Sequence, residues 1–376
     1  MIRQAYRGLA SFARRDVVLT TAILLAVLSA FFVPPSPAYL SYIDWDTLCL
    51  LFSLMAVMKG FQQEGFFQSM GSALLRRAGS TRRMVLVLVF LPFFCSMAIT
   101  NDVSLITFVP FGLAVLKLAQ QEELAVPLVV LQTLAANLGS MLTPMGNPQN
   151  LYLYSRSGMG FGELCAVMLP YVLLSGICLL GLSVLRPSHP NAPPRVNTRR
   201  TNPRRLGMWG AWFFLCLLGL FGAVPSWAVA ALVLIFLFLR ERPVLRAVDY
   251  SLLGTFAAFF LFIGNLSAIP WFQQLLSSVL QGREVLVSVL VSQVVSNVPA
   301  ALLLSGFTED WTGLLIGCNL GGLGTLIASM ASLISYKQVS REYPQQRGRY
   351  LLWFTASNAG MLLLLLLEHQ ALRALF

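Results

Sequence analysis

Long apolar runs alternate with short polar segments along the whole chain, and many of these runs are long enough to cross a lipid bilayer. A transmembrane helix needs about 20 predominantly apolar residues. On this criterion the pattern predicts an all-α polytopic membrane protein with seven simple crossings. They cover residues 16–33, 46–60, 161–185, 207–223, 225–239, 249–266 and 350–367.

Two further apolar segments, 83–118 and 283–308, carry a polar motif in their middle. The arm 299–308 would be only about 15 Å long as a helix, which is half of the hydrocarbon core. A segment that short cannot complete a crossing. Both segments therefore predict a re-entrant helical hairpin, which enters and leaves the membrane on the same side.

Residues 122–157 and 311–336 form another matched pair of segments. The first would be about 54 Å long as one straight helix, which is too long for a single span. It also contains TPMGNP at 143–148, where two prolines and a glycine interrupt a helix. Each segment predicts a transmembrane helix broken near its middle, which brings the total to about nine full crossings plus two hairpins.

Charged residues fix the orientation that this topology predicts. With the N-terminus in the cytoplasm, only Arg156, Arg283 and Arg373 of the 26 Lys and Arg residues lie outside. Cytoplasmic loops of membrane proteins carry such an excess of positive charge. We therefore expect a multi-pass protein of the bacterial inner (plasma) membrane, with its C-terminus outside. The net charge of +11 belongs to these loops and indicates no nucleic-acid partner.

An internal repeat is the strongest pattern in the sequence. Residues 137–151, NLGSMLTPMGNPQNL, align without gaps to residues 319–333, NLGGLGTLIASMASL. An Asn-centred motif precedes each copy, MAITNDVSL at 97–105 and VVSNVPAAL at 294–302. Apolar helices that start at Asp46 and Asp249 correspond in the same way.

The repeat divides the chain into two halves of opposite orientation. The first inverted repeat covers 16–185 and the second covers 224–367. Between them, 186–223 predicts a basic, Pro-rich cytoplasmic linker and one extra helix, which inverts the second half. Inverted repeats with discontinuous helices are typical of secondary transporters, with the binding site where the two copies meet.

The two hairpin tips and the two helix breaks supply the candidate site. Helix N-termini at such breaks suit an anion, and free carbonyl and side-chain oxygens suit Na⁺. The predicted substrate- and ion-binding residues are Thr100, Asn101, Asp102, Thr143, Gly146, Asn147, Asn150, Ser296, Asn297, Thr325 and Ser329. Asn101, Asp102 and Asn297 are the candidate Na⁺ ligands, and no other cofactor is expected.

Asp102 is the only acidic residue that this topology places at membrane depth. An ionisable residue there costs roughly 2.5–3.5 kcal/mol on insertion scales, which favours a function as proton carrier or cation ligand. The alternative is that it simply caps the second hairpin helix. Asn101 and Asn297 contact the substrate or an ion, or else make an interhelical hydrogen bond. Val298 occupies the place of Asp102 in the second copy, so the role is asymmetric.

The sequence lacks the residues that an enzyme would need, and a primary pump would need a separate ATPase subunit. The two histidines lie in a loop and near the C-terminus, and the chain has no HExxH motif and no GxxxxGK[ST] nucleotide loop. The six cysteines fall in apolar stretches without CxxC spacing, which indicates neither a metal site nor a disulfide framework. The composition, 57% hydrophobic and 11% charged with a mean hydropathy of +0.74, indicates an integral membrane protein with many spans.

TNDVSLITFVP, SNVPAALLLSGF and the two repeat motifs resemble the ion transporter superfamily over roughly residues 16–367. It includes arsenite pumps, sodium/proton antiporters, citrate permeases and divalent-anion/sodium symporters, and the chain looks most like short bacterial anion permeases with a citrate-transporter-like domain. In the dicarboxylate branch each tip carries Ser-Asn-Thr, which binds carboxylate and Na⁺, so the resemblance implies such roles for Asn101, Ser296 and Asn297. Thr-Asn-Asp and Ser-Asn-Val here are more similar to the arsenite and antiporter branches.

Two transport functions follow from these observations. The first is secondary active transport of a small inorganic or organic anion by alternating access, coupled to H⁺ or Na⁺. The alternative is a cation (Na⁺)/proton antiporter that exchanges ions at Asp102. The resemblance also implies a scaffold that can form a homodimer in the bilayer and a site-bearing part that moves as an elevator.

Overall fold

The computed structural model describes residues 17–185 and 201–375, and these residues form helices and no strand. The predicted all-α fold is confirmed for this part of the chain. The predicted cytoplasmic N-terminus and the stretch 186–200 of the predicted linker lie outside the described residues.

All seven segments predicted as simple crossings contain one dominant helix. These helices are α2 (Val17–Ala30), α4 (Trp45–Gln63), α10 (Phe161–Val184), α11 (Pro203–Leu220), α12 (Ser226–Arg240), α14 (Tyr250–Ser267) and α20 (Arg347–Leu375). The last is longer at both ends than the predicted 350–367, because its N-terminal turn and a C-terminal polar segment extend the same helix. Short helices α3 (Tyr39–Tyr42) and α13 (Arg242–Arg246) flank α4 and α12.

Five helices in the described ranges are long and apolar enough to cross a membrane. A sixth span is possible if α15 (Pro270–Leu280) and α16 (Glu284–Val295), which meet at 111°, are counted together. These findings support a polytopic membrane protein, and the expected total of about nine crossings stays a prediction.

Both segments that were predicted as hairpins are interrupted at their polar motif. Helix α6 (Thr81–Cys95) ends before the first motif and α7 (Asn101–Leu118) begins at its Asn. In the second segment only Ser296 separates α16 from α17 (Asn297–Leu304). The second pair is short, as expected, whereas α7 alone has 18 residues, or about 27 Å. That the pairs re-enter the membrane stays a prediction.

Both predicted broken helices are also interrupted. Helix α8 (Ala125–Gly139) passes through two short 3₁₀ turns into α9 (Pro148–Ser157), with Pro148 at the first helical position, where its missing N–H is harmless. Helix α18 (Trp311–Leu320) is followed by the non-helical stretch 321–329 and then by α19 (Met330–Glu342). Helix α19 extends beyond the predicted end at residue 336.

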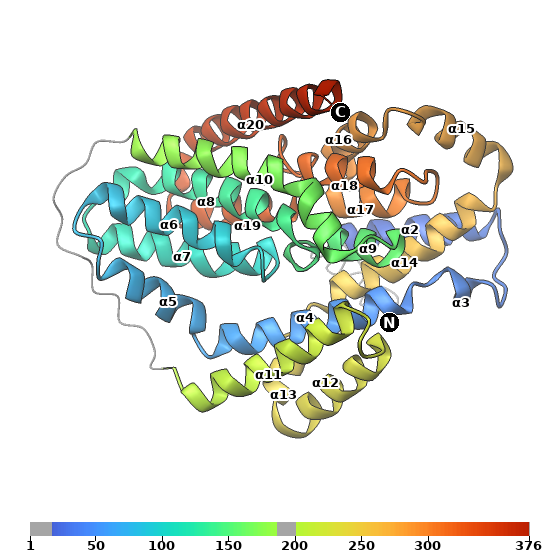
Figure 1. The fold of residues 1–376 in the computed structure, drawn as a ribbon, viewed down its shortest axis with the longest axis horizontal. Helices are drawn as coiled ribbons and strands as arrows, with labels where there is room; N and C mark the ends of the chain where they lie inside the picture. The colour runs from blue at the N-terminus through green and yellow to red at the C-terminus, as the bar shows by residue number, and fades with distance from the viewer. Residues whose placement is uncertain (1–16, 186–200, 376) are drawn as a thin grey trace, which may run out of the picture.

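Helix α8 forms the centre of one group of helices, and every one of its side chains is buried. It contacts α6, α7, α10, α19 and α20, which surround it in the upper part of Figure 1. A second group lies below, where α4 packs against α11 and α12 (Figure 1). Helix α14 runs along α2 and also contacts α4 and α17, while α5 (Phe66–Leu75) contacts α4, α6 and α7, so these helices join the two groups.

The outer helices expose apolar side chains and bury small polar ones. On α10, Leu173 is 56% exposed and Ile177 is 66% exposed, whereas Ser175 and Ser183 are fully buried. Large apolar patches are unfavourable in water. Lipid is the solvent that suits such a surface, which agrees with the hydropathy of the sequence.

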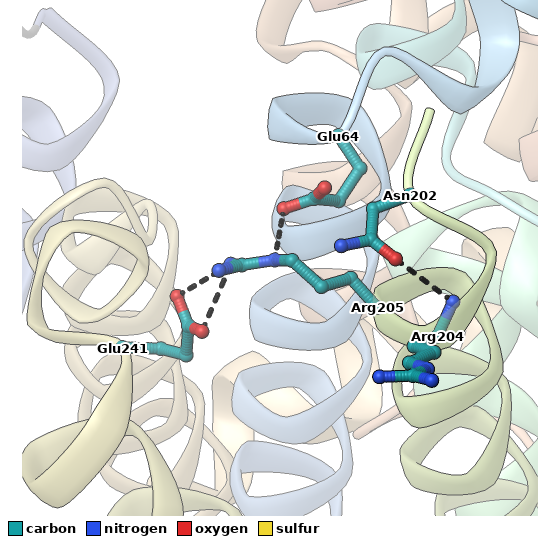
Figure 2. Close-up of polar contacts among 5 residues, drawn as sticks. All are labelled: Glu64, Asn202, Arg204, Arg205 and Glu241. Atoms are coloured by element: carbon teal, nitrogen blue, oxygen red, sulfur yellow. Dashed lines mark hydrogen bonds and ion pairs between the residues drawn. The ribbon is translucent and has the colours of Figure 1, made fainter. Parts of the chain in front are cut away.

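An ion-pair cluster ties three elements of the second group together. The Arg205 side chain on α11 lies between two carboxylates, Glu64 at the end of α4 and Glu241 after α12 (Figure 2). Its Nε is 2.7 Å from a Glu64 oxygen, and its Nη2 donates to both Glu241 oxygens at 2.9 and 3.0 Å. Arg205 thus holds the ends of α4 and α12 through charge-assisted hydrogen bonds, which are stronger than those between neutral groups.

Replacing Arg205 by Gln should lower the free energy of unfolding in detergent by about 0.5–1 kcal/mol, because the guanidinium is partly exposed and water screens it. The neighbouring Arg204 provides the control, since no ion pair is found for its side chain among the described residues (Figure 2). Chemical denaturation should show a loss for Arg205→Gln that shrinks in high salt and no comparable loss for Arg204→Gln. Equal effects would contradict a specific cluster.

Glycines allow the closest approach between the hairpin arms and the broken helices. A Cβ added at Gly139 would lie 2.0 Å from the Phe93 carbonyl oxygen and 2.8 Å from Ser96 Oγ. A Cβ at Gly321 would lie 2.6 Å from Ser292 Oγ. The two contacts are equivalent, because each glycine occupies the same position of the repeat and each serine lies five residues before the motif Asn.

Gly139→Ala should therefore destabilise the protein, by about 1–3 kcal/mol if the helices shift to accommodate the methyl group. Gly181 in α10 is the matched control, because a Cβ there meets nothing within 4 Å. Gly181→Ala should leave the melting temperature unchanged or raise it slightly, since alanine favours a helix. A normal melting temperature for Gly139→Ala would show that this contact is looser than described.

Candidate functional site

Four helices begin at one internal cavity of about 90 Å³. These are the helices that follow the two hairpin tips and the two breaks: α7, α9, α17 and α19. Their first residues, which all line the cavity, are Asn101, Pro148, Asn297 and Met330. A helix N-terminus presents free N–H groups and roughly half a positive charge. The cavity therefore receives positive potential from four directions without a cationic side chain.

Six of the eleven predicted site residues line this cavity. They are Asn101, Asp102, Asn147, Ser296, Asn297 and Ser329. They come from both halves of the chain and from both kinds of motif, so the tips and breaks meet as the repeat predicts. The binding roles of these residues stay predictions.

The other five predicted residues lie beside the cavity. Thr100 lines a smaller, mostly apolar space of about 20 Å³. The Thr143 hydroxyl donates to the Met97 carbonyl, which joins the first break to the first tip. Gly146 packs so tightly that a Cβ would lie 2.1 Å from the Ser140 carbonyl oxygen. None of these three residues lines the cavity itself.

Asn150 holds the first break together. Its Nδ2 lies 3.3 Å from each of the carbonyl oxygens of Ser140, Met141 and Thr143. Carbonyls that leave a helix inside a membrane protein need other partners, since each unsatisfied group is costly away from water. One buried amide supplies these partners here.

Gln293 plays the same part at the second break, where position 332 is a serine. Its Nε2 donates to the carbonyls of Gly321 and Leu323 at 3.0 Å, and its Oε1 accepts from the backbone N–H of Thr325 at 2.9 Å. The amide comes from the hairpin helix α16 and not from the broken helix itself. The second tip and the second break are therefore linked directly.

Asn137 and Asn319, which occupy the same position of the repeat, join the two halves. Asn137 Oδ1 accepts from Ser329 Oγ at 3.2 Å, and its Nδ2 donates to Ser332 Oγ at 3.4 Å. Asn319 Nδ2 donates to Asn150 Oδ1 at 2.7 Å, and its Oδ1 accepts from Asn147 at 3.4 Å.

Residues 147 and 150 align with 329 and 332, so each of these asparagines contacts the corresponding pair in the other half. Reciprocal contacts of this kind arise when two copies are related by a two-fold axis. They support the predicted internal repeat. Asn101 joins the same network, because its Nδ2 donates to Asn137 Oδ1 at 2.9 Å.

The acidic groups of the cavity are Asp102 and Asp249. Asp102 lies in the first turn of α7, and its Oδ1 is buried without a hydrogen-bond partner in the described structure. Asp249 caps α14 by accepting from the Leu252 N–H at 3.1 Å, and it is exposed. None of the described residues that line the cavity is Lys, Arg or His. The side-chain charge is thus negative, and only the helix N-termini oppose it.

The second hairpin tip has a strained backbone. Ser296 has φ +76° and ψ 154°, a conformation that costs a non-glycine residue about 1–3 kcal/mol. Thr100, at the first tip, has φ −64° and is relaxed. The Asn297 N–H donates to the Ala328 carbonyl at 3.0 Å, so the strained tip is held against the second break.

Comparison with known proteins identifies the family. The sequence pattern of the family described as citrate transporter matches residues 8–309. Inner membrane protein YbiR of Escherichia coli is 33% identical over 328 residues, which cover 85% of this chain and 86% of YbiR. The chain belongs to the citrate transporter family.

Other relatives of this chain come from distant organisms. An uncharacterized transporter of Methanocaldococcus jannaschii is 31% identical over 299 residues, covering 78% of this chain and 81% of its own. A silicon efflux transporter of Oryza sativa subsp. japonica is 34% identical over 165 residues, covering 43% of this chain and 33% of its own. The family and its relatives are transporters and not enzymes, which confirms that part of the prediction. The similarity to an inner membrane protein supports a multi-pass inner membrane protein.

The sequence analysis of this citrate transporter family member did not predict the polar cavity residues Gln149, Asp249, Ser251 and Thr255. Gln149 lies between the predicted Asn147 and Asn150, at the second position of α9, and its place in the break could have signalled it. Asp249 looked like a cytoplasmic helix start, and nothing in the sequence places it in the same cavity as Asp102. The corresponding N-cap in the first half is Asp44 and not Asp46, since α4 begins at Trp45.

Asn319→Ala should lower the free energy of unfolding by about 1–3 kcal/mol, because it leaves the buried Asn150 Oδ1 without its donor. Asn358 is a suitable control, since it is fully buried but its amide donates only to the Phe354 carbonyl of its own helix. Denaturation in detergent should therefore rank Asn319→Ala well below Asn358→Ala in stability. The reverse order would argue against Asn319 as a link between the halves.

Proposed function

We propose that this protein is a secondary active transporter that moves a small inorganic or organic anion across the inner membrane, coupled to H⁺ or Na⁺. The observation that carries the proposal is the convergence of four helix N-termini on a cavity that also contains Asp102. Helix N-termini favour an anion, and a carboxylate favours a cation or a proton. One cavity can thus hold both partners of a coupled transport cycle.

The size of the cavity favours a small solute. Its volume of about 90 Å³ is less than the roughly 150 Å³ of an engineered protein cavity that holds benzene. An occupant of a few heavy atoms fits this conformation. One relative is a silicon efflux transporter, whose name refers to a small inorganic solute of that relative alone.

Asp102 is the proposed site of coupling. A free anion would meet its carboxylate at close range, and no Lys, Arg or His among the described cavity residues offsets that charge. A proton or Na⁺ on Asp102 removes the repulsion, so the anion binds best after the coupling ion. Asn101 and Asn297 supply further amide oxygens for Na⁺ from the two tips.

Alternating access requires that the cavity open to one side at a time. It reaches the exposed Asp249, which follows a basic segment and lies on the expected cytoplasmic side. Away from this opening, Tyr152 near the middle of α9 bonds to Ser305 after α17 at 2.7 Å, and both line a separate pocket of about 350 Å³. We propose that this state faces the cytoplasm and that the Tyr152–Ser305 contact closes the other side.

A cation (Na⁺)/proton antiporter is the second candidate. Two carboxylates, Asp102 and Asp249, line the cavity without a positively charged partner in the described part of the chain. Such a site attracts cations and can exchange a metal cation for a proton. Only the helix N-termini favour an anion. Coupled transport would place an anion in the cavity together with the cation or proton, whereas an antiporter would place the cation or the proton there without an anion.

Thermal unfolding of the purified protein with a panel of small anions, with and without Na⁺ at pH 5.5 and 8, should separate the two functions. A ligand at 100 times its dissociation constant should stabilise the protein by about 2.7 kcal/mol. For coupled anion transport we expect an anion to act only with Na⁺ or at low pH, and Asp102→Asn to remove that dependence.

The exposed Glu123 provides a control for the loss of one negative charge, and Glu123→Gln should behave as wild type. Stabilisation by Na⁺ alone, dependent on pH and abolished by Asp102→Asn, would replace anion transport by cation/proton exchange. No response to any anion, cation or pH change would refute both proposals.

A further inference from the structure

Gln149 is a buried amide without hydrogen-bond partners. Its side chain is 0% exposed, and neither Oε1 nor Nε2 has a partner among the described residues. The residue lines the cavity of about 90 Å³ at which α7, α9, α17 and α19 begin. Leaving one buried polar group unpaired costs about 1–3 kcal/mol. Native proteins rarely keep such a group unless a ligand, an ion or water satisfies it.

Among the described residues, Gln149 is the only Asn or Gln whose amide nitrogen and amide oxygen are both buried without a partner. Gln132 donates to the carbonyls of Leu88 and Phe108 at 3.0 and 3.1 Å, and thereby joins the two arms of the first hairpin. Gln293 bonds to three backbone groups of the second break. Because Gln149 bonds to none of the described residues, its amide is free to bind what enters the cavity.

The position of Gln149 in helix α9 also favours contact with a ligand. Gln149 is the second residue of the ten-residue helix α9, so the free N–H groups of the first turn lie beside its side chain. The aligned residue of the second half is Ala331, which has no polar side chain. The amide therefore belongs to one half of the site only, as does Asp102.

The unpaired atoms of the cavity also specify a ligand. Asp102 Oδ1 and Asn147 Oδ1 are buried without partners, in addition to the two amide atoms of Gln149. Three of these four atoms are oxygens, which accept hydrogen bonds, and only Nε2 donates. A fully deprotonated oxyanion brings acceptors alone, so even with the coupling ion on Asp102 it would satisfy Nε2 and leave Gln149 Oε1 and Asn147 Oδ1 facing further oxygens.

We infer that Gln149 binds the transported anion through an oxygen acceptor and a hydroxyl donor on the same small group. The substrate is then a partly protonated oxyacid anion, one that keeps at least one hydroxyl. Its anionic oxygen meets Nε2 and the N-terminus of α9, and its hydroxyl donates to Oε1, Asn147 or Asp102. This inference rests on the proposed anion transport and narrows the class of substrate.

Two matched pairs of anions test the ligand class. Hydrogen phosphate and sulfate at pH 8 share charge and tetrahedral shape but differ in a hydroxyl, and bicarbonate and nitrate differ in the same way among planar, singly charged anions. We expect the hydroxyl-bearing member of at least one pair to bind the full-length protein at least tenfold more tightly than its partner, measured by thermal shift with Na⁺ present and by uptake into liposomes.

Gln149→Leu tests the residue. Loss of the amide should weaken binding of the preferred anion by roughly tenfold or more. The melting temperature without ligand should stay unchanged or rise, since the substitution breaks no hydrogen bond within the protein. Gln132→Leu is the matched control, and it should melt at a lower temperature while the folded protein keeps its affinity for the anion.

Each other outcome overturns a defined part of the inference. Wild-type affinity in Gln149→Leu, or a fall in its melting temperature like that of Gln132→Leu, would exclude a ligand-binding amide. Preference for sulfate or nitrate would overturn the ligand class and leave anion transport standing. If no anion binds while Na⁺ stabilises the wild type but not Asp102→Asn, the proposed anion transport fails together with this inference.

Discussion

The backbone of this protein is interrupted four times in its interior, and the hydrogen bonds freed by these interruptions constrain the rest of the site. Carbonyls that leave a helix away from water must find other donors. Asn150 supplies them at the first break, and Gln293 supplies them at the second. The helices that follow the interruptions then begin at one cavity, where their N-termini contribute a partial positive charge. The same interruptions thus create both a structural requirement and a place where a ligand can bind.

The two halves contribute equal architecture and unequal chemistry. Asn137 and Asn319 make reciprocal contacts, and Gly139 and Gly321 pack against equivalent serines. Among the described residues that line the cavity, the buried polar groups that lack partners nevertheless come from the first half. Asp102 and Gln149 correspond to Val298 and Ala331 in the second half. A ligand would therefore contact a carboxyl group and an unpaired amide from the first half only. The second half supplies hydroxyls, an amide and the strained backbone of Ser296.

Sequence periodicity and breakers predicted most of the local structure. Apolar runs gave the helices, and the prolines at 144 and 148 with Gly146 gave the first break, because proline and glycine act on the backbone wherever they occur. The interruption at the second break has no proline, and the alignment to the first copy located it. Helix ends were less accurate, as for α19 and α20, because packing and capping decide where a helix stops.

By itself, the sequence determined the all-α membrane class, the interrupted helices and six of the residues that line the cavity, since hydrophobic length, backbone stereochemistry and repetition are local properties of the chain. Only the tertiary structure decided which polar groups are hydrogen-bonded within the protein and which have no partner and can bind a ligand. The Asn150 amide and the Thr325 hydroxyl donate to backbone carbonyls, whereas the Gln149 amide has no partner among the described residues. Asp249 and Asp102 line the same cavity because residues far apart in the chain meet where helices pack. The sequence pattern does not show how far apart two such residues lie in space.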